Sequence, residues 1–141
     1  MKIAVIDGQG GGIGKYIIQR LRDAYPQGPD IIALGTNALA TSNMLKAGAN
    51  DGASGEHAII YMAPQVDVIV GSLAIIVANA FFGELTPQAA SAITASPALK
   101  LLLPVNRTGI LIAGESAEPL PHQVDRLLVD IGRLIEGENN V

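Results

Sequence analysis

The chain begins with a short apolar run that ends at an acidic residue and closely spaced glycines, and a helical pattern follows. Lys2–Asp7 (KIAVID) is typical of a buried strand, and Ile13–Tyr25 carries apolar residues at the spacing of an amphipathic helix. The glycines between them are residues 8, 10, 11, 12 and 14. A strand that turns through glycines directly into a helix is typical of α/β folds, because the helix then packs back on the sheet.

Strand-like and helix-like segments alternate along the rest of the chain. Further strands are predicted at Asp30–Gly35, Ala49–Ala53, Val66–Gly71, Leu99–Val105 and Gly109–Ala113. Further helices are predicted at Ala38–Ala47, Glu56–Met62, Pro87–Ala95 and Pro121–Ile135, with Thr86 as the N-cap of the third. We therefore predict a three-layer, doubly wound, mostly parallel, Rossmann-like sheet in one domain, residues 1–135, and a polar tail at 136–141.

The last two predicted strands are separated by three residues, Asn106 to Thr108. That connection is too short for a parallel crossover, which needs a dozen or more residues. The sequence therefore predicts an antiparallel hairpin near residues 99–113, at one edge of the sheet.

Composition excludes several classes of protein. The chain has no cysteine, so disulfides and thiolate metal sites are excluded, and no metal site is predicted. Net charge is −4 without a basic run, and aromatic residues make up 4% of the chain. Nucleic acid is therefore not an expected partner.

The chain is unusually apolar, with 49% hydrophobic residues. One interpretation is that parallel strands buried on both faces account for this, and the other adds an apolar surface patch that buries on self-association. We expect a homo-oligomer, most simply a dimer. The chain opens directly on a strand pattern, and its longest apolar stretch, Val68–Phe82, is shorter than the roughly 20 residues that span a bilayer. A cytoplasmic protein without a membrane span is expected.

The glycine loop is the first candidate site. Glycines let a backbone approach a ligand closely, and the N–H groups of Gly8, Gln9, Gly10, Gly11, Gly12, Ile13 and Gly14 at the start of a helix are suited to a phosphate. The alternative interpretation is a tight turn that only lets helix pack on strand. A true P-loop is excluded, because Gln9 stands where its first glycine belongs and Tyr16 replaces the Mg²⁺-binding hydroxyl.

The spacing Gly8-x-x-x-Gly12-Ile13-Gly14 resembles the glycine turn of short-chain dehydrogenases, which implies a dinucleotide. Two features of that family are missing. The corner after the second strand is Gly35-Thr36-Asn37 in place of an acid for the ribose, and no Tyr-x-x-x-Lys pair occurs. The cofactor therefore stays unknown, with a nucleotide or dinucleotide as candidates.

Other polar residues follow the predicted strands at the edge where such sheets bind ligands. Thr36 and Asn37 open a helix, where they either cap it or bind phosphate. Asn106 and Arg107 follow a predicted strand, where Arg107 is an anion partner or an exposed turn residue. Ser72 is a further accessory candidate.

Three more residues have two interpretations each. Asp7 either stabilises the glycine turn or binds a ribose or metal, and His122 is either a surface residue or a general base. Glu84, between Gly83 and the cap Thr86, is interpreted as a loop residue.

Residues 33–107 resemble methylglyoxal synthase and its phosphate-binding relatives, but Gly71-Ser72 stand where that family has its catalytic Asp. The strings IAVIDGQGGGIGK, VDVIVG, GELTP and LLLPVNR resemble an uncharacterised prokaryotic family of small proteins over nearly the whole chain. That resemblance implies a Rossmann-like fold and supplies no activity.

The leading hypothesis is a domain that binds a nucleotide or another phosphorylated small molecule at Gly8–Gly14. One alternative is an enzyme acting on a phosphorylated metabolite, with Asp7 or His122 as acid or base. The other is a non-enzymatic, oligomeric regulatory protein that associates through Leu73–Phe82. Whether any reaction is catalysed stays open at this point.

Overall fold

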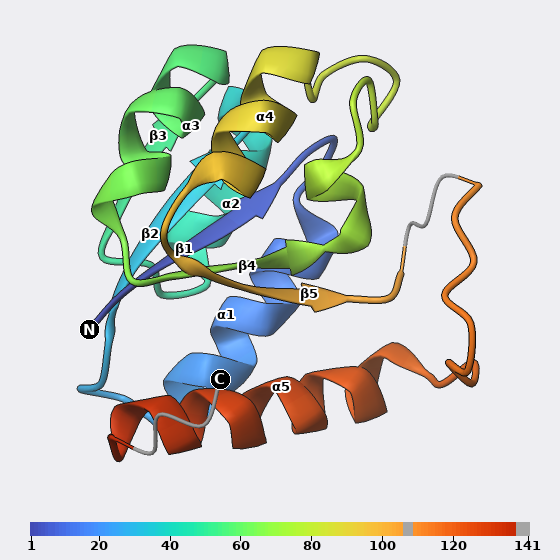
Figure 1. The fold of residues 1–141 in the computed structure, drawn as a ribbon. Coiled ribbons are helices and arrows are strands. Elements are labelled where there is room, and N and C mark those ends of the chain that lie inside the picture. Colours follow the sequence, from blue (N-terminus) through green and yellow to red (C-terminus); the bar gives the residue numbers. More distant parts are fainter. Residues whose placement is uncertain (106–108, 138–141) are drawn as a thin grey trace.

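A five-stranded sheet in which all strands run parallel forms the centre of the molecule (Figure 1). The computed structural model describes residues 1–105 and 109–137. The order of the strands across the sheet is β3-β2-β1-β4-β5.

 The bounds are β1 Lys2–Asp7, β2 Asp30–Gly35, β3 Asp51–Ser54, β4 Val68–Ser72 and β5 Leu99–Leu103. The predicted α/β class with a Rossmann-like sheet is confirmed.

The central strand, β1, lies between β2 and β4, with Lys2 opposite Asp30 and Ile3 opposite Val68. Its residues 3–6 are almost completely buried. A strand buried on both faces carries a continuous apolar run instead of an alternating pattern, which is why KIAVID is typical of a buried strand.

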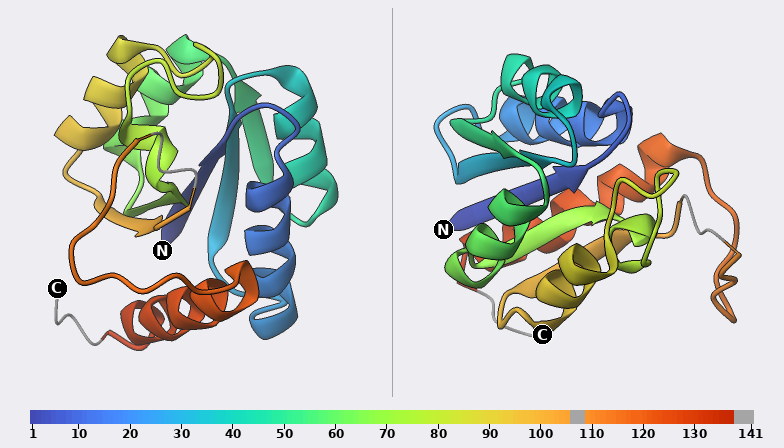
Figure 2. Two further views of the ribbon diagram at one scale, coloured as in Figure 1. Left: turned by 90° about the vertical axis from the view of Figure 1, so that its right-hand side faces the viewer. Right: turned by 90° about the horizontal axis from the view of Figure 1, so that it is seen from above.

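Helices cover both faces of the sheet (Figure 2). They are α1 (Gly12–Ala24), α2 (Ala38–Lys46), α3 (Glu56–Met62), α4 (Pro87–Ala95) and α5 (Leu120–Ile135), with short 3₁₀ turns η1 (Ala63–Gln65) and η2 (Leu73–Ile76). Side chains of α1, α2 and α5 share one core cluster, which includes Ile17, Met44 and Ile131. Side chains of α3 and α4 share the other, which includes Ile59 and Ile93.

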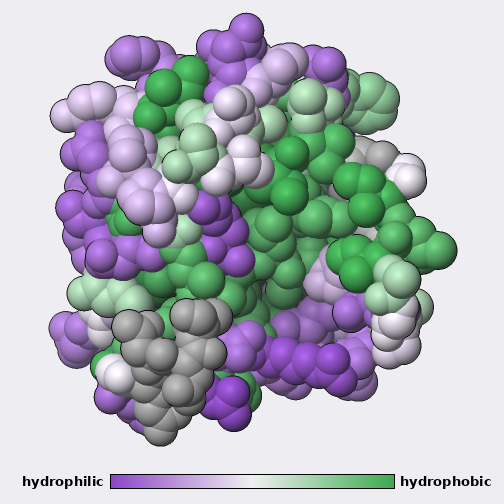
Figure 3. All heavy atoms as spheres, in the orientation of Figure 1, coloured by the Kyte–Doolittle hydropathy of each residue, from purple (hydrophilic) through white to green (hydrophobic). Residues whose placement is uncertain are grey.

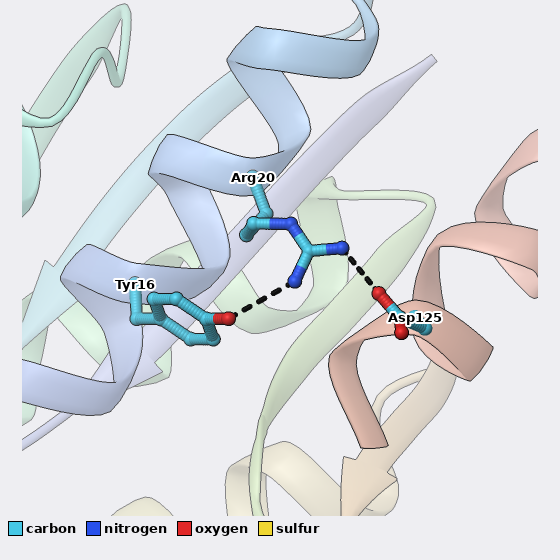
Figure 4. A network of polar contacts seen from close by, with 3 residues as sticks. All are labelled: Tyr16, Arg20 and Asp125. Atoms are coloured by element: carbon cyan, nitrogen blue, oxygen red, sulfur yellow. Dashed lines mark hydrogen bonds and ion pairs between the residues drawn. The ribbon is translucent and has the colours of Figure 1, made fainter. Parts of the chain in front are cut away.

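Helices α1 and α5 are also joined by polar side chains (Figure 4). The Arg20 guanidinium donates to the Tyr16 hydroxyl over 3.0 Å and lies 5.7 Å from the centre of that ring. It also forms an ion pair with Asp125 of α5. Because these groups are partly exposed to water, the contact orients the two helices more than it stabilises them.

Several elements coincide with the sequence prediction residue for residue, namely β1, β2, α3 and α4. The Thr86 hydroxyl accepts the Ala89 N–H over 3.1 Å, so the predicted N-cap of α4 is confirmed. The other helices and β3, β4 and β5 differ from the predicted bounds by one or two residues at an end. Hydrophobic periodicity predicts where an element lies more accurately than it predicts the first and last residues of that element.

The predicted antiparallel hairpin near residues 99–113 is wrong. Strand β5 pairs parallel with β4, with Leu99 opposite Val68, and residues 109–113 form no strand. Helix α4 supplies the crossover that makes β5 parallel, and the chain after β5 leads instead towards α5. An apolar run becomes a strand only where a partner strand is available, and residues 109–113 are exposed.

Within the described residues, no helix is both long enough and apolar enough to cross a membrane.

Candidate functional site

The glycine loop, residues 8–14, connects the carboxyl end of β1 to α1 (Figure 1). The corner after β2, Gly35 to Asn37, lies beside it, because β1 and β2 are paired along their whole length. The Thr36 N–H donates to the Asp7 carbonyl over 3.0 Å and so continues the pairing to the loop. The structure therefore brings together the two corners that the sequence predicted at the same edge of the sheet.

Packing explains three of the glycines in this loop. A Cβ on Gly8 would lie 2.7 Å from the Phe81 ring, and one on Gly14 would lie 2.5 Å from the Met44 sulfur. Gly11 has a left-handed backbone, with φ of 72°, against the backbone of Ala40. These glycines allow close contact between strand, helix and neighbouring loop, as the alternative interpretation of the loop requires.

Packing does not explain Gly10 and Gly12. A Cβ on either residue would meet no atom within 4 Å, and neither has a positive φ. Both are exposed, and within the described part of the chain no acceptor is recorded for their N–H groups. Two backbone donors at the start of α1 are therefore open to solvent.

Asp7 holds the turn together from inside. Its Oδ1 accepts the Gly8 N–H over 2.8 Å, and its Oδ2 accepts the Gly14 N–H over 2.7 Å. The side chain is buried, which raises the pKa of Asp7 above its ordinary value, although the N–H groups of Gly14, Gly8 and Ile13 oppose that effect. With both oxygens engaged by the backbone, this carboxylate stabilises the turn.

Glu84 contributes a second carboxylate, from the loop that precedes α4. Its Oε1 accepts the Gln9 N–H and the Thr36 hydroxyl, each over 2.7 Å, and the Asn37 side-chain amide over 3.1 Å. These donors, foremost the Thr36 hydroxyl, hold the pKa of Glu84 below its ordinary value. The donors of both corners thus converge on one anionic oxygen.

Asn37 caps α2, which is one of the two roles predicted for this corner, and it also contacts the glycine loop. Its Oδ1 accepts the Ala40 N–H over 2.9 Å and so caps α2. Its Nδ2 donates to the Gln9 carbonyl over 2.8 Å as well as to Glu84. Gln9 itself has a left-handed backbone, with φ of 51°, which turns its N–H towards the Glu84 carboxylate.

Ser72 lies at the carboxyl end of β4, the strand next to β1. It is 1% exposed, and its hydroxyl finds no hydrogen-bond partner among the described residues. By strand alternation it faces the same side of the sheet as Val70, which packs in the α1 cluster. A buried hydroxyl without a partner is unusual in folded proteins.

The remaining predicted residues are not brought to the loop by any described contact. His122 is exposed in the first turn of α5, and no bond links its side chain to residues 8–14 in the described ranges. Asn106 and Arg107 lie outside the described residues. Around the described glycine loop the site consists of neutral hydrogen-bond donors and the carboxylates of Asp7 and Glu84, which accept from them.

Sequence reasoning missed Glu84. The only signal was an acidic residue between a glycine and a helix cap, a pattern that many loops share. Its partners lie 47 to 75 positions away along the chain, so the contact depends on how the β4–α4 connection folds back over β1 and β2.

Comparison with known proteins identifies the family. A family model described as "Domain of unknown function (DUF3842)" matches residues 2–136, so the chain belongs to that family. No curated protein and no solved structure matches the chain. The match agrees with the predicted resemblance to an uncharacterised family, while a prokaryotic origin stays a prediction.

Proposed function

We propose that this family member binds a nucleotide or another phosphorylated small molecule at the glycine loop. The N–H groups of Gly10 and Gly12 would hold a phosphate at the start of α1, where the helix dipole favours negative charge. Thr36 and Asn37 would contact the neighbouring part of the ligand. Arg107, predicted from the sequence, stays a candidate to cover it.

The observation that carries this proposal is the pair of glycines that packing does not require. A Cβ on Gly10 or Gly12 would meet no neighbouring atom, whereas a Cβ on Gly8, Gly11 or Gly14 would clash with one. A glycine without a steric reason is expected where a ligand approaches the backbone closely.

A panel of phosphorylated compounds tests the proposal. NAD(P), ATP, GTP, FMN, coenzyme A and sugar phosphates are added separately at millimolar concentration, and the melting temperature is followed. A ligand present at 100 times its Kd stabilises the folded state by about 2.7 kcal/mol, which is a measurable shift. Native mass spectrometry of the freshly purified protein reports any retained ligand. The proposal fails if no compound stabilises the protein and no ligand is retained.

A second candidate function, self-association, is favoured by one surface. Ile110, Leu111 and Ile112 are exposed, and apolar atoms extend from the middle of one face to the edge where residues 109–113 lie (Figure 3). The segment Leu73–Phe82 is a poorer surface than expected, because Ala74, Ile75, Ala80 and Phe81 are buried. A second copy of the chain is the partner proposed for residues 110–112.

A further inference from the structure

The Glu84 carboxylate is bound by three donors in the way that the anionic group of a ligand would be. We propose that the Glu84 carboxylate occupies an anion subsite of the glycine corner in the unliganded chain, and that a phosphate group of the ligand displaces it. This inference rests on the function proposed above and adds a regulation of that same site: the chain competes with its own ligand.

The donors around Glu84 are those that a phosphate oxygen requires. A backbone N–H, a hydroxyl and a side-chain amide converge on Oε1 at 2.7, 2.7 and 3.1 Å. All three donors are neutral, so the subsite binds an anion without a matched cation. The Gln9 N–H also adjoins the open N–H of Gly10, which makes the occupied subsite continuous with the open one. A diphosphate fits two adjoining subsites of this kind.

The carboxylate can leave without unfolding the loop that carries it. Glu84 is exposed, whereas the loop backbone is tied by the Asn79 N–H to the Leu85 carbonyl at 2.7 Å and by the Leu85 N–H to the Ala80 carbonyl at 3.1 Å. Phe81 and Leu85 are buried on either side of it. Rotation of the Glu84 side chain alone therefore empties the subsite, and exposed side chains rotate within nanoseconds.

Electrostatics make the occupancy competitive. The Glu84 carboxylate lies close enough to Asp7 to contribute to the raised pKa of that buried residue. A phosphate entering beside Glu84 would meet two carboxylates, and like charges at one site oppose each other. When the phosphate replaces Glu84, the repulsion between the phosphate and the Glu84 carboxylate is removed. The three donors then bind a phosphate oxygen in place of the carboxylate oxygen.

The test is a titration with pyrophosphate and, separately, ADP, followed through the backbone amide resonances of Gly10 and Gly12. Four proteins are compared: the unmodified chain, Glu84→Ala, Glu84→Gln and the control Glu115→Gln, which removes one exposed carboxylate from residues 109–119. If the subsite is free in about a tenth of the unmodified molecules, Glu84→Ala binds about tenfold more tightly. The affinity of Glu84→Gln is expected to lie between those of Glu84→Ala and the unmodified chain. The affinity of Glu115→Gln is expected to match that of the unmodified chain.

Each outcome is decisive. Tighter binding by both Glu84 variants, with Glu115→Gln unchanged, supports the inference, as does binding that appears only in the Glu84 variants. Equal or weaker binding by the Glu84 variants overturns it and leaves the proposed function standing. If neither probe shifts Gly10 or Gly12 in any of the four proteins, the inference is overturned, whereas the proposed function is decided by the wider panel of phosphorylated compounds. Because Glu84 is exposed, circular dichroism is expected to show all four proteins folded alike.

Discussion

At the scale of single residues, the glycine loop separates glycines that packing requires from glycines that it does not. Gly14 faces the Met44 sulfur and the Asp7 side chain, whereas Gly12 begins α1 in open space. Both residues belong to the first turn of α1, so the two positions share a backbone conformation and differ mainly in the atoms that surround them. That pair separates the structural role of the loop from its proposed binding role.

Alanine at these two positions is expected to act in opposite directions on stability. Gly12→Ala raises the free energy of unfolding by about 0.5–1 kcal/mol, because alanine is the better helix former. Gly14→Ala lowers it by about 1–3 kcal/mol, because the new Cβ overpacks the contact with Met44. Urea denaturation measures both changes.

The same Gly12→Ala variant tests the binding site. Its Cβ would stand where the proposed phosphate approaches, so we expect weaker binding of whichever phosphorylated compound stabilises the unmodified protein, despite the gain in stability. A variant that is more stable and binds equally well would show that Gly12 does not face the ligand.

The two carboxylates at the corner are expected to respond oppositely to pH. The folded-state pKa of Glu84 lies below its ordinary 4.5, so its contribution to stability is present above that value and is lost as the pH falls through the folded pKa. The folded-state pKa of Asp7 lies above its ordinary 3.8, so its contribution is present below 3.8 and is lost as the pH rises through the folded pKa.

Comparison of the unmodified chain with Glu84→Gln isolates the pH-dependent contribution of Glu84 to stability. The difference in their free energies of unfolding is expected to shrink as the pH is lowered from about 6 to about 3, because protonated Glu84 no longer gains from its three donors. Urea denaturation at several pH values measures it, with Glu115→Gln as the control for loss of a charge. A difference that stays constant with pH would contradict the Glu84 contacts.

At the scale of elements, the connection between η2 and α4 is the least regular part of the site. Asn79, Phe81 and Phe82 all have left-handed backbones, with φ of 67°, 58° and 55°. Such a conformation costs about 1–2 kcal/mol for a residue with a Cβ, so the surrounding structure must over-determine it. Phe81 provides that support, because it is buried against Gly8, while Phe82 is 98% exposed.

Glycine at the two phenylalanines distinguishes strain from packing. Phe82→Gly relieves the backbone strain and loses no buried surface, so the free energy of unfolding is expected to be unchanged or to rise by up to about 1 kcal/mol. Phe81→Gly relieves the same strain but removes a core side chain, so the free energy of unfolding is expected to fall by about 3–5 kcal/mol. Thermal unfolding of the two variants measures the contrast; equal effects would show that the rings are equivalent in the fold.

At the scale of the whole molecule, the parallel sheet explains where the site lies. Five strands that all run the same way place their carboxyl ends at one edge, where the glycine loop, the Thr36–Asn37 corner and Ser72 gather. Ligands bind at such edges in open α/β sheets. The apolar surface of residues 110–112 belongs to a different segment, so association and binding can be tested separately.

Self-association predicts a dimer or larger species for the unmodified chain in light scattering. Leu111 is 83% exposed, so Leu111→Glu is expected to shift that species towards monomer while changing the free energy of unfolding of the monomer by less than about 0.5 kcal/mol. Leu39→Glu, at an exposed leucine of α2, is the matched control. A monomer at high concentration in the unmodified chain, or no effect of Leu111→Glu, would remove this surface as an interface.

The sequence by itself determined most of the elements and their assembly into a mostly parallel sheet, because buried strands, amphipathic helices and caps leave local patterns. KIAVID, DIIALG and the Thr86-Pro87 cap are examples in which residue pattern and structure coincide. It also determined that the glycine loop and the Thr36–Asn37 corner would meet, since carboxyl ends of paired parallel strands share an edge.

Only the tertiary structure decided what lies between those two corners. The Glu84 carboxylate reaches the Gln9 N–H from 75 positions away, and no local pattern encodes that approach. The same holds for residues 109–113, whose apolar composition indicated a strand although no partner strand receives them. Local patterns report which conformation a segment prefers, whereas contacts between distant segments depend on the packing of the whole chain.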